Sequence, residues 1–201
     1  MPQHDERFTI RRKIIKFFGA AFHVYDDKGG LVAFCKQKAF RLREDIRLYT
    51  DESLAEEFLS LRSRQVIDFG ATYDVALPDG QVIASLRRKG LKSTFLRDSW
   101  LVYGPRVDDD AGTPAEPVAT LQEDSAGLGF LRRSVDLAAM LVPQKFHLET
   151  PEGRSVATLR THFNPLVYRL SIAIHEEHPD LDELAILATG CLIAAIEGRQ
   201  N

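Results

Sequence analysis

The chain is poor in cysteine, with only Cys35 and Cys191 among its 201 residues, and it contains no C-x-x-C pair. Two thiols so far apart exclude a disulfide scaffold and fit the reducing interior of a cell. The first residues, MPQHDERFTIRRK, also lack the apolar segment of a secretory signal peptide. The sequence therefore predicts a cytoplasmic protein.

Catalytic signatures are also missing. No G-x-S-x-G, H-E-x-x-H, P-loop or G-x-G-x-x-G occurs, so the sequence predicts neither an enzyme nor a cofactor. The run from His175 to His178 (HEEH) has no third ligand at a recognisable spacing, and Asp108–Asp110 lacks the spacing of an EF-hand loop. We expect no metal site. An enzyme remains an alternative, because the mouth of a barrel can hold a pocket that spacing does not reveal.

Long apolar runs are absent except near the carboxyl end. The segment Pro179–Gly198 predicts a helix in which Asp180 acts as the N-cap and Glu183 reaches back to it. Between Leu184 and Ile196 only Thr189 and Gly190 are not apolar, so no face of this helix suits water. Its 16 residues from Leu181 to Ile196 span about 24 Å, and a membrane helix needs about 20 apolar residues. We therefore expect a helix buried in protein, and a membrane span is the alternative.

Elsewhere, short alternating runs separated by turn residues predict ten to twelve strands. Three hairpins have the same spacing from glycine to alanine, Gly29–Ala33, Gly80–Ala84 and Gly153–Ala157, which indicates either a duplicated unit or common turn chemistry. Other expected strands are Phe8–Phe18, Phe40–Tyr49, Pro117–Glu123, Leu137–Val142 and Tyr168–Ile174. A closed antiparallel β-barrel of about twelve strands leaves no open edge and surrounds the apolar helix. We predict one such mainly β domain over residues 1–201, with its core at about 20–198.

Charge is unevenly distributed along the chain. Residues 1–100 hold 18 Lys and Arg against 14 Asp and Glu, whereas residues 101–201 hold 8 against 15. Such asymmetry suits an anionic partner, although two halves lying side by side would also balance. The candidate anion-binding or lipid-headgroup residues are Lys36, Lys38, Arg41, Arg43, Arg87, Arg88, Lys89, Lys92 and Arg97. Convergent guanidinium and ammonium groups are what a phosphate needs.

Several motifs in order resemble one family. They are the run from Val24 to Ser53 (VYDDKGGLVAFCKQKAFRLREDIRLYTDES), IDFGATYDV, RRKGLKS, RDSW, QEDS, VPQKF, FNP and AIEGRQ. These are similar to bacterial LURP-one-related proteins of the tubby-like superfamily, which also includes the phospholipid scramblases. The resemblance covers about Ala20–Gln200. It implies a twelve-stranded closed barrel around a central hydrophobic C-terminal helix.

The resemblance is more specific for the fold than for an activity. The phosphoinositide pocket of tubby domains has no residue-by-residue counterpart here, and the calcium-associated segment of scramblases is not recognisable. We expect a non-enzymatic domain that binds an anionic partner, namely phospholipid or phosphoinositide headgroups at a membrane surface. The alternatives are a protein-interaction or structural module without a small ligand, and a scramblase-like membrane protein. Nucleic acid is not expected as a partner, since the chain is not strongly basic.

Overall fold

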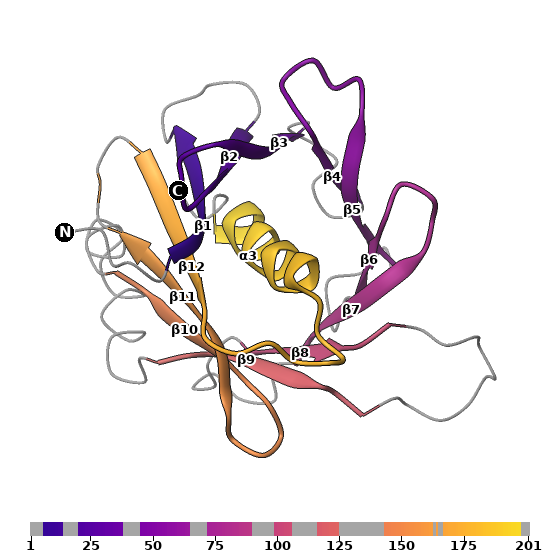
Figure 1. Ribbon diagram of the computed structural model, residues 1–201, viewed down its shortest axis with the longest axis vertical. Coiled ribbons are helices and arrows are strands. Elements are labelled where there is room, and N and C mark those ends of the chain that lie inside the picture. Colours follow the sequence, from indigo (N-terminus) through magenta and orange to yellow (C-terminus); the bar gives the residue numbers. More distant parts are fainter. Residues whose placement is uncertain are drawn as a thin grey trace.

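The computed structural model shows a closed antiparallel barrel of twelve strands with a helix inside it (Figure 1). It describes residues 6–13, 20–37, 45–64, 72–89, 99–105, 116–124, 143–162, 164 and 167–197. The strands are β1 (Glu6–Lys13), β2 (Ala20–Asp26), β3 (Leu31–Gln37), β4 (Asp45–Tyr49), β5 (Glu57–Ser63), β6 (Thr72–Ala76), β7 (Val82–Arg88), β8 (Ser99–Tyr103), β9 (Ala119–Glu123), β10 (Lys145–Glu149), β11 (Ser155–His162) and β12 (Val167–Ile174). The helix is α3 (Glu183–Glu197). The predicted fold class is confirmed.

Each strand pairs with its neighbours in the chain, and β1 closes the ring by pairing with β12. Alternation decides which side chains face inward. In β4, Ile46 and Leu48 are buried, whereas Asp45 and Arg47 between them are exposed. Leu48 lies opposite Cys35 of β3, which is also fully buried. The barrel interior is therefore mainly apolar, and most of the described charged side chains lie on the outer wall; Arg12, only 6% exposed, is an exception.

The three hairpins that repeat in the sequence also share one turn geometry. Gly29, Gly80 and Gly153 all have positive φ, between 81° and 91°, which favours glycine. In each turn the glycine N–H donates to the carbonyl three residues earlier, at 2.9–3.1 Å. Each hairpin also has a register shift in the strand before its turn. The repeated spacing therefore corresponds to a repeated turn geometry.

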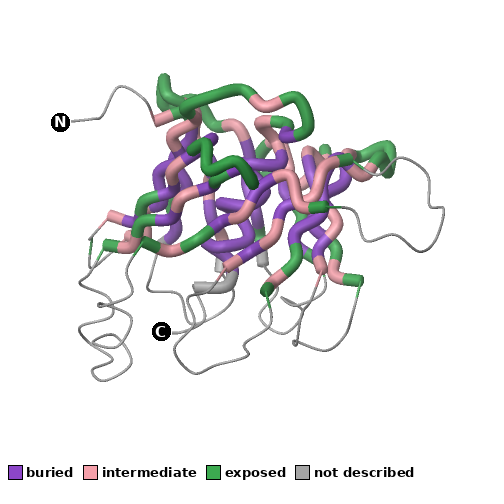
Figure 2. Tube along the Cα trace, turned by 90° about the horizontal axis from the view of Figure 1, so that it is seen from below, coloured by how far each residue is buried: buried purple, intermediate pink, exposed green. Residues whose placement is uncertain are grey.

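Helix α3 lies inside the ring, and every side chain from Ala185 to Ala195 is buried (Figures 1 and 2). Its one hydroxyl is satisfied locally, because Thr189 Oγ1 donates to the Ala185 carbonyl at 2.8 Å. The predicted cap is wrong by two residues. Asp182, not Asp180, accepts the Leu184 N–H at 2.7 Å and begins the helix. Residues from His178 to Leu181 instead form a small bridge before it.

The barrel has two distinct ends. Because neighbouring strands alternate in direction, the turns β2–β3, β4–β5, β6–β7, β8–β9 and β10–β11 all lie at the end where α3 begins. We refer to this as the entry end, and to the opposite one as the far end. The odd-numbered strands run from the entry end to the far end.

Other predicted strands and turns have bounds that differ from those in the structure. The first strand begins at Glu6 rather than Phe8, and the expected strand Phe40–Tyr49 is described only from Asp45. The segment Thr50–Leu61, expected as a short helix or a turn, is a turn followed by β5. The expected strand Leu137–Val142 lies outside the described residues. Within the described ranges, no helix has the length and apolar character that crossing a lipid bilayer requires.

Candidate functional site

Four of the nine candidate residues lie in the part of the chain that the structure describes. Lys36 is near the end of β3, Arg87 and Arg88 end β7, and Lys89 follows directly. The other five, Lys38, Arg41, Arg43, Lys92 and Arg97, lie outside the described residues.

The described candidates occupy the same end of the barrel. Strands β3 and β7 run in the same direction because four antiparallel pairings separate them. Lys36 and the residues at the end of β7 therefore both lie at the far end. Neighbouring strands are about 4.8 Å apart, so Lys36 and Arg87 are separated by about 19 Å around the wall. The described members of the two basic runs therefore lie on one side of the barrel but are not in contact with each other.

The structure places two adjacent candidates on opposite faces of the wall. Arg88 lies directly opposite Trp100 of β8, which is only 4% exposed and belongs to the core. Residues paired across an antiparallel sheet share a face, so Arg88 is directed inward. Arg87 lies opposite Thr72 and Leu101 and is exposed on the outer wall. The run Arg87–Lys89 is therefore not one outward cluster.

A further cation, Arg62, belongs to the same outer surface and was not among the candidates. It lies on β5 between β3 and β7, and it is exposed. In EFLSLRS, Leu59 and Leu61 face inward, so the alternation of a strand places Arg62 on the outer face. This alternation could have identified Arg62 from the sequence. We call Lys36, Arg62, Arg87 and Lys89 the basic wall.

Within the described part of the chain, no carboxylate forms an ion pair with any member of the basic wall. Two neighbouring arginines, in contrast, form ion pairs with carboxylates. Arg47 is paired with Asp45 and Glu57, and its hydrogen bond to Asp45 raises the pKa of the guanidinium. Arg64 is paired with Asp74. Lys36, Arg87 and Lys89 therefore keep their positive charge available to an external anion, whereas Arg62 lies directly opposite Asp45 and Asp74, which offset part of its charge.

The entry end has the opposite character. Acidic residues outnumber basic ones in its described turns and in the lead-in to α3. The acidic residues are Asp26, Asp27, Asp51, Glu52, Glu56, Asp79, Glu116, Glu152, Glu176, Glu177, Asp180, Asp182 and Glu183. The basic residues there are Arg7, Lys28 and Arg154.

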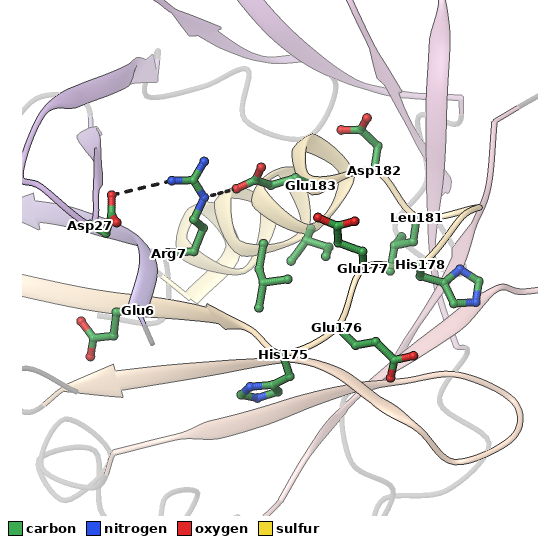
Figure 3. Close-up of a pocket in the computed structure, with 12 residues that line it drawn as sticks. Glu6, Arg7, Asp27, His175, Glu176, Glu177, His178, Leu181, Asp182 and Glu183 are labelled. Carbon is green, nitrogen blue, oxygen red and sulfur yellow. Dashed lines mark hydrogen bonds and ion pairs between the residues drawn. The ribbon is translucent and has the colours of Figure 1, made fainter. Parts of the chain in front are cut away.

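A pocket of about 510 Å³ opens at the entry end, beside the start of α3 (Figure 3). Its floor is apolar, formed by Ile174, Leu181 and Ile186, and most of its charged residues are carboxylates. Figure 3 shows Arg7 between Asp27 and Glu183, and it forms ion pairs with both. The hydrogen bond to Glu183 raises the pKa of Arg7. This pocket repels anions, because its single arginine is already paired.

The HEEH run, His175–His178, lies on the rim of this pocket. Among the residues that the structure describes, no group of three side chains is arranged to hold a metal ion. The run instead makes local contacts. His175 Nε2 lies 2.8 Å from Thr158 Oγ1, and Glu176 pairs with Arg154.

The two cysteines are core residues. Both are fully buried, and burial raises the pKa of Cys35 to about 12 and that of Cys191 well above its ordinary value. Their thiols therefore stay protonated and unreactive at neutral pH.

The chain matches no model of a known protein family, and a search of curated proteins also finds no match. The charge distribution of the barrel is therefore the main indication of its function.

Proposed function

We propose that this chain is a non-enzymatic, tubby-like barrel domain that binds anionic phospholipid headgroups at a membrane surface. The LURP-one-related resemblance implies a closed barrel with an apolar helix inside. The chain has this fold, which supports the proposed kinship. The proposed location is cytoplasmic and peripheral to the membrane.

The observation that carries this function is the separation of charge between the two ends of the barrel. Unpaired cations of the basic wall lie toward the far end, whereas the entry end is acidic. A negatively charged bilayer attracts the far end and repels the entry end. The domain therefore approaches with the far ends of β3, β5 and β7 toward the lipid, and the opening beside α3 faces away.

The size of the effect follows from the number of cations. Each Lys or Arg near an anionic bilayer contributes about 1 kcal/mol. The four residues of the basic wall together contribute about 4 kcal/mol by this estimate, which corresponds to weak and reversible attachment. Such attachment is sensitive to salt, because the Debye length falls to about 3 Å at about 1 M ionic strength.

Pelleting with vesicles tests the proposal. We expect the protein to sediment with phosphatidylcholine vesicles that contain phosphatidylserine, and to stay in the supernatant with phosphatidylcholine alone or at high salt. Arg87→Glu removes one charge of the basic wall and adds a repulsive one, so it should lower the bound fraction. Lys28→Glu is the matched control, since it makes the same charge change in an exposed turn at the entry end.

Equal sedimentation with neutral and anionic vesicles, or an equal loss in both variants, would contradict the proposal. If no lipid effect appears and affinity purification recovers a stoichiometric protein, the domain is an interaction module instead. Because Arg87 and Lys28 are both exposed, neither substitution removes a core contact.

A further inference from the structure

The outer wall on the other side of the barrel carries a second depression, which shares Glu6 and His175 with the lining of the entry-end pocket. Its floor is formed by three short side chains on β11 and β12, Thr158, Ser171 and Ala173. Longer side chains surround this floor, and the cavity has a volume of about 570 Å³. Cavities of this size hold small organic molecules, whereas a bare inorganic ion fills only a small part of them.

Two cations occupy one edge of the depression in an unfavourable arrangement. Lys145 of β10 lies directly opposite Arg160 of β11 in the strand register. Like charges in directly opposed positions destabilise a sheet. Lys145 is 3.8 Å from Asp124, which His147 also contacts at 2.9 Å. Among the described residues, no carboxylate forms an ion pair with Arg160. An anion bound between Lys145 and Arg160 would remove this repulsion.

Glu6, the carboxylate among the described residues that line the depression, does not occupy that position, and Asp124, 3.8 Å from Lys145, is not part of the lining. Glu6 lies on the opposite edge of the depression, where Arg169 Nη2 donates to its Oε2 at 2.8 Å. His162 Nε2 is 3.7 Å from the other oxygen, Oε1. Burial lowers the pKa of His162, and the positive charges of Arg169 and Arg160 lower it further, against the opposing effect of Glu6. Glu6 is thus engaged by Arg169 and lies close to His162, whereas Arg160 has no such carboxylate partner among the described residues.

Hydrogen bonds hold the surroundings of the depression in place. His162 Nε2 lies 2.7 Å from Ser171 Oγ, and Thr158 Oγ1 lies 2.8 Å from His175 Nε2. On the third side, the Gln144 N–H donates to Thr161 Oγ1 at 2.5 Å, and the Gln144 carbonyl accepts the Thr161 N–H at 2.8 Å. A site that is formed before the ligand arrives loses less entropy on binding.

We propose that this depression binds a small molecule carrying a phosphate monoester, with the phosphate between Lys145 and Arg160 and the rest of the molecule over Thr158, Ser171 and Ala173. A phosphate monoester carries about −1.5 to −2 charges at pH 7 and matches two cations, whereas a carboxylate would neutralise only one. The site lies on β10–β12, apart from the basic wall on β3–β7. It therefore goes beyond the proposed membrane attachment and does not depend on it.

Titration calorimetry with glycerol 3-phosphate tests this site on the full chain, with glycerol as the uncharged control. We expect saturable binding of glycerol 3-phosphate and none of glycerol. Arg160→Gln should weaken binding by at least tenfold, and Ala173→Met should weaken it by filling the floor. Lys28→Gln removes a cation at the entry end and should leave the affinity unchanged. Arg160 is exposed, so Arg160→Gln is expected to fold normally.

Vesicles of phosphatidylcholine with phosphatidic acid distinguish a free phosphate ester from a lipid headgroup. If Arg160→Gln weakens vesicle binding and glycerol 3-phosphate does not bind, the monoester belongs to a lipid, and the site stands. If neither probe depends on Arg160, or if Lys28→Gln has the same effect, the inference is overturned. Charge reversal at Arg87 should weaken binding to both kinds of anionic vesicle and leave glycerol 3-phosphate binding unchanged, so the calorimetry lets the two proposals fail separately.

Discussion

Replacing Gly190 with alanine provides a sharp test of how closely α3 fits inside the barrel. Glycine inside a helix is normally unfavourable, and changing it to alanine adds about 1 kcal/mol of helix propensity. At this position, however, a Cβ atom would come far inside van der Waals contact with Cδ1 of Ile172 on β12. It would also lie only 3.3 Å from Cδ1 of Ile10 on β1. Both isoleucines are fully buried.

The magnitude follows from these opposing effects. Inserting an extra methyl group into a packed core costs about 1–3 kcal/mol, because neighbouring side chains must leave their preferred rotamers. Subtracting the gain in propensity leaves a net destabilisation of about 1 kcal/mol. In a chain of this size, that lowers the melting temperature by about 2–4 °C. The sign is therefore the reverse of that expected for an exposed helix.

A double-mutant cycle in denaturant, followed by circular dichroism, assigns the effect to one contact. Ile172→Val removes the Cδ1 methyl and alone should cost about 0.5–1.5 kcal/mol. In the double variant the new alanine methyl occupies the vacated space, so the combined loss should be smaller than the sum by about 1 kcal/mol or more. Additivity within about 0.5 kcal/mol, or a stabilised Gly190→Ala, would show that α3 does not pack against β12 in this way.

Three further outcomes can be measured on the same protein. Because the folded pKa of His162 lies below 6.5, the unfolded state binds more protons below that pH, so stability falls as the pH drops through 6.5. The fall should be smaller in His162→Gln, as urea midpoints at several pH values would show; equal falls would refute the assignment. Cys35 and Cys191 should resist Ellman's reagent until the protein unfolds, and rapid reaction of the native protein would contradict their burial. Leu187→Ala should cost about 2–5 kcal/mol in urea unfolding, whereas Leu31→Ala, on a side chain 41% exposed, should cost less than about 0.5 kcal/mol.

The architecture was predictable because two strong local signals agree. Alternating strands with turn residues require a sheet, and a helix without any polar face requires a wall around it. Gly29, Gly80 and Gly153 marked three turns correctly, since a positive φ leaves little choice of residue. The sequence determines the first residue of α3 less clearly. Asp180 and Asp182 are both good caps, and only the bridge between His178 and Leu181 moves the first helical turn to the second of them.

The candidate site was predictable in composition but not in orientation. Arg87 and Arg88 are equivalent in sequence, and the side of the wall that each occupies depends on the register of β7 with β8. A shift of one residue would exchange them. Arg62 was overlooked because it is the one cation within β5 and lies outside the two basic runs of the sequence. The depression beside Arg160 was also invisible, because it depends on short side chains meeting across two strands.

The division of charge between the two halves of the sequence differs from its division between the two ends of the barrel. In a barrel whose strands follow one another, every second connection reaches the same end. The acidic turns around Asp27 and Glu52 come from the N-terminal half, and those around Glu152 and Glu177 come from the C-terminal half, yet all lie at the entry end. The cations of the basic wall come from the same N-terminal half but lie at the other end. Among the described residues, the entry-end turns therefore combine carboxylates from both halves of the sequence, whereas β3, β5 and β7 carry exposed cations toward their other ends. A chain that folds in this way acquires an electrostatic axis parallel to its strands, and that axis, not the net charge, determines which end meets an anionic surface.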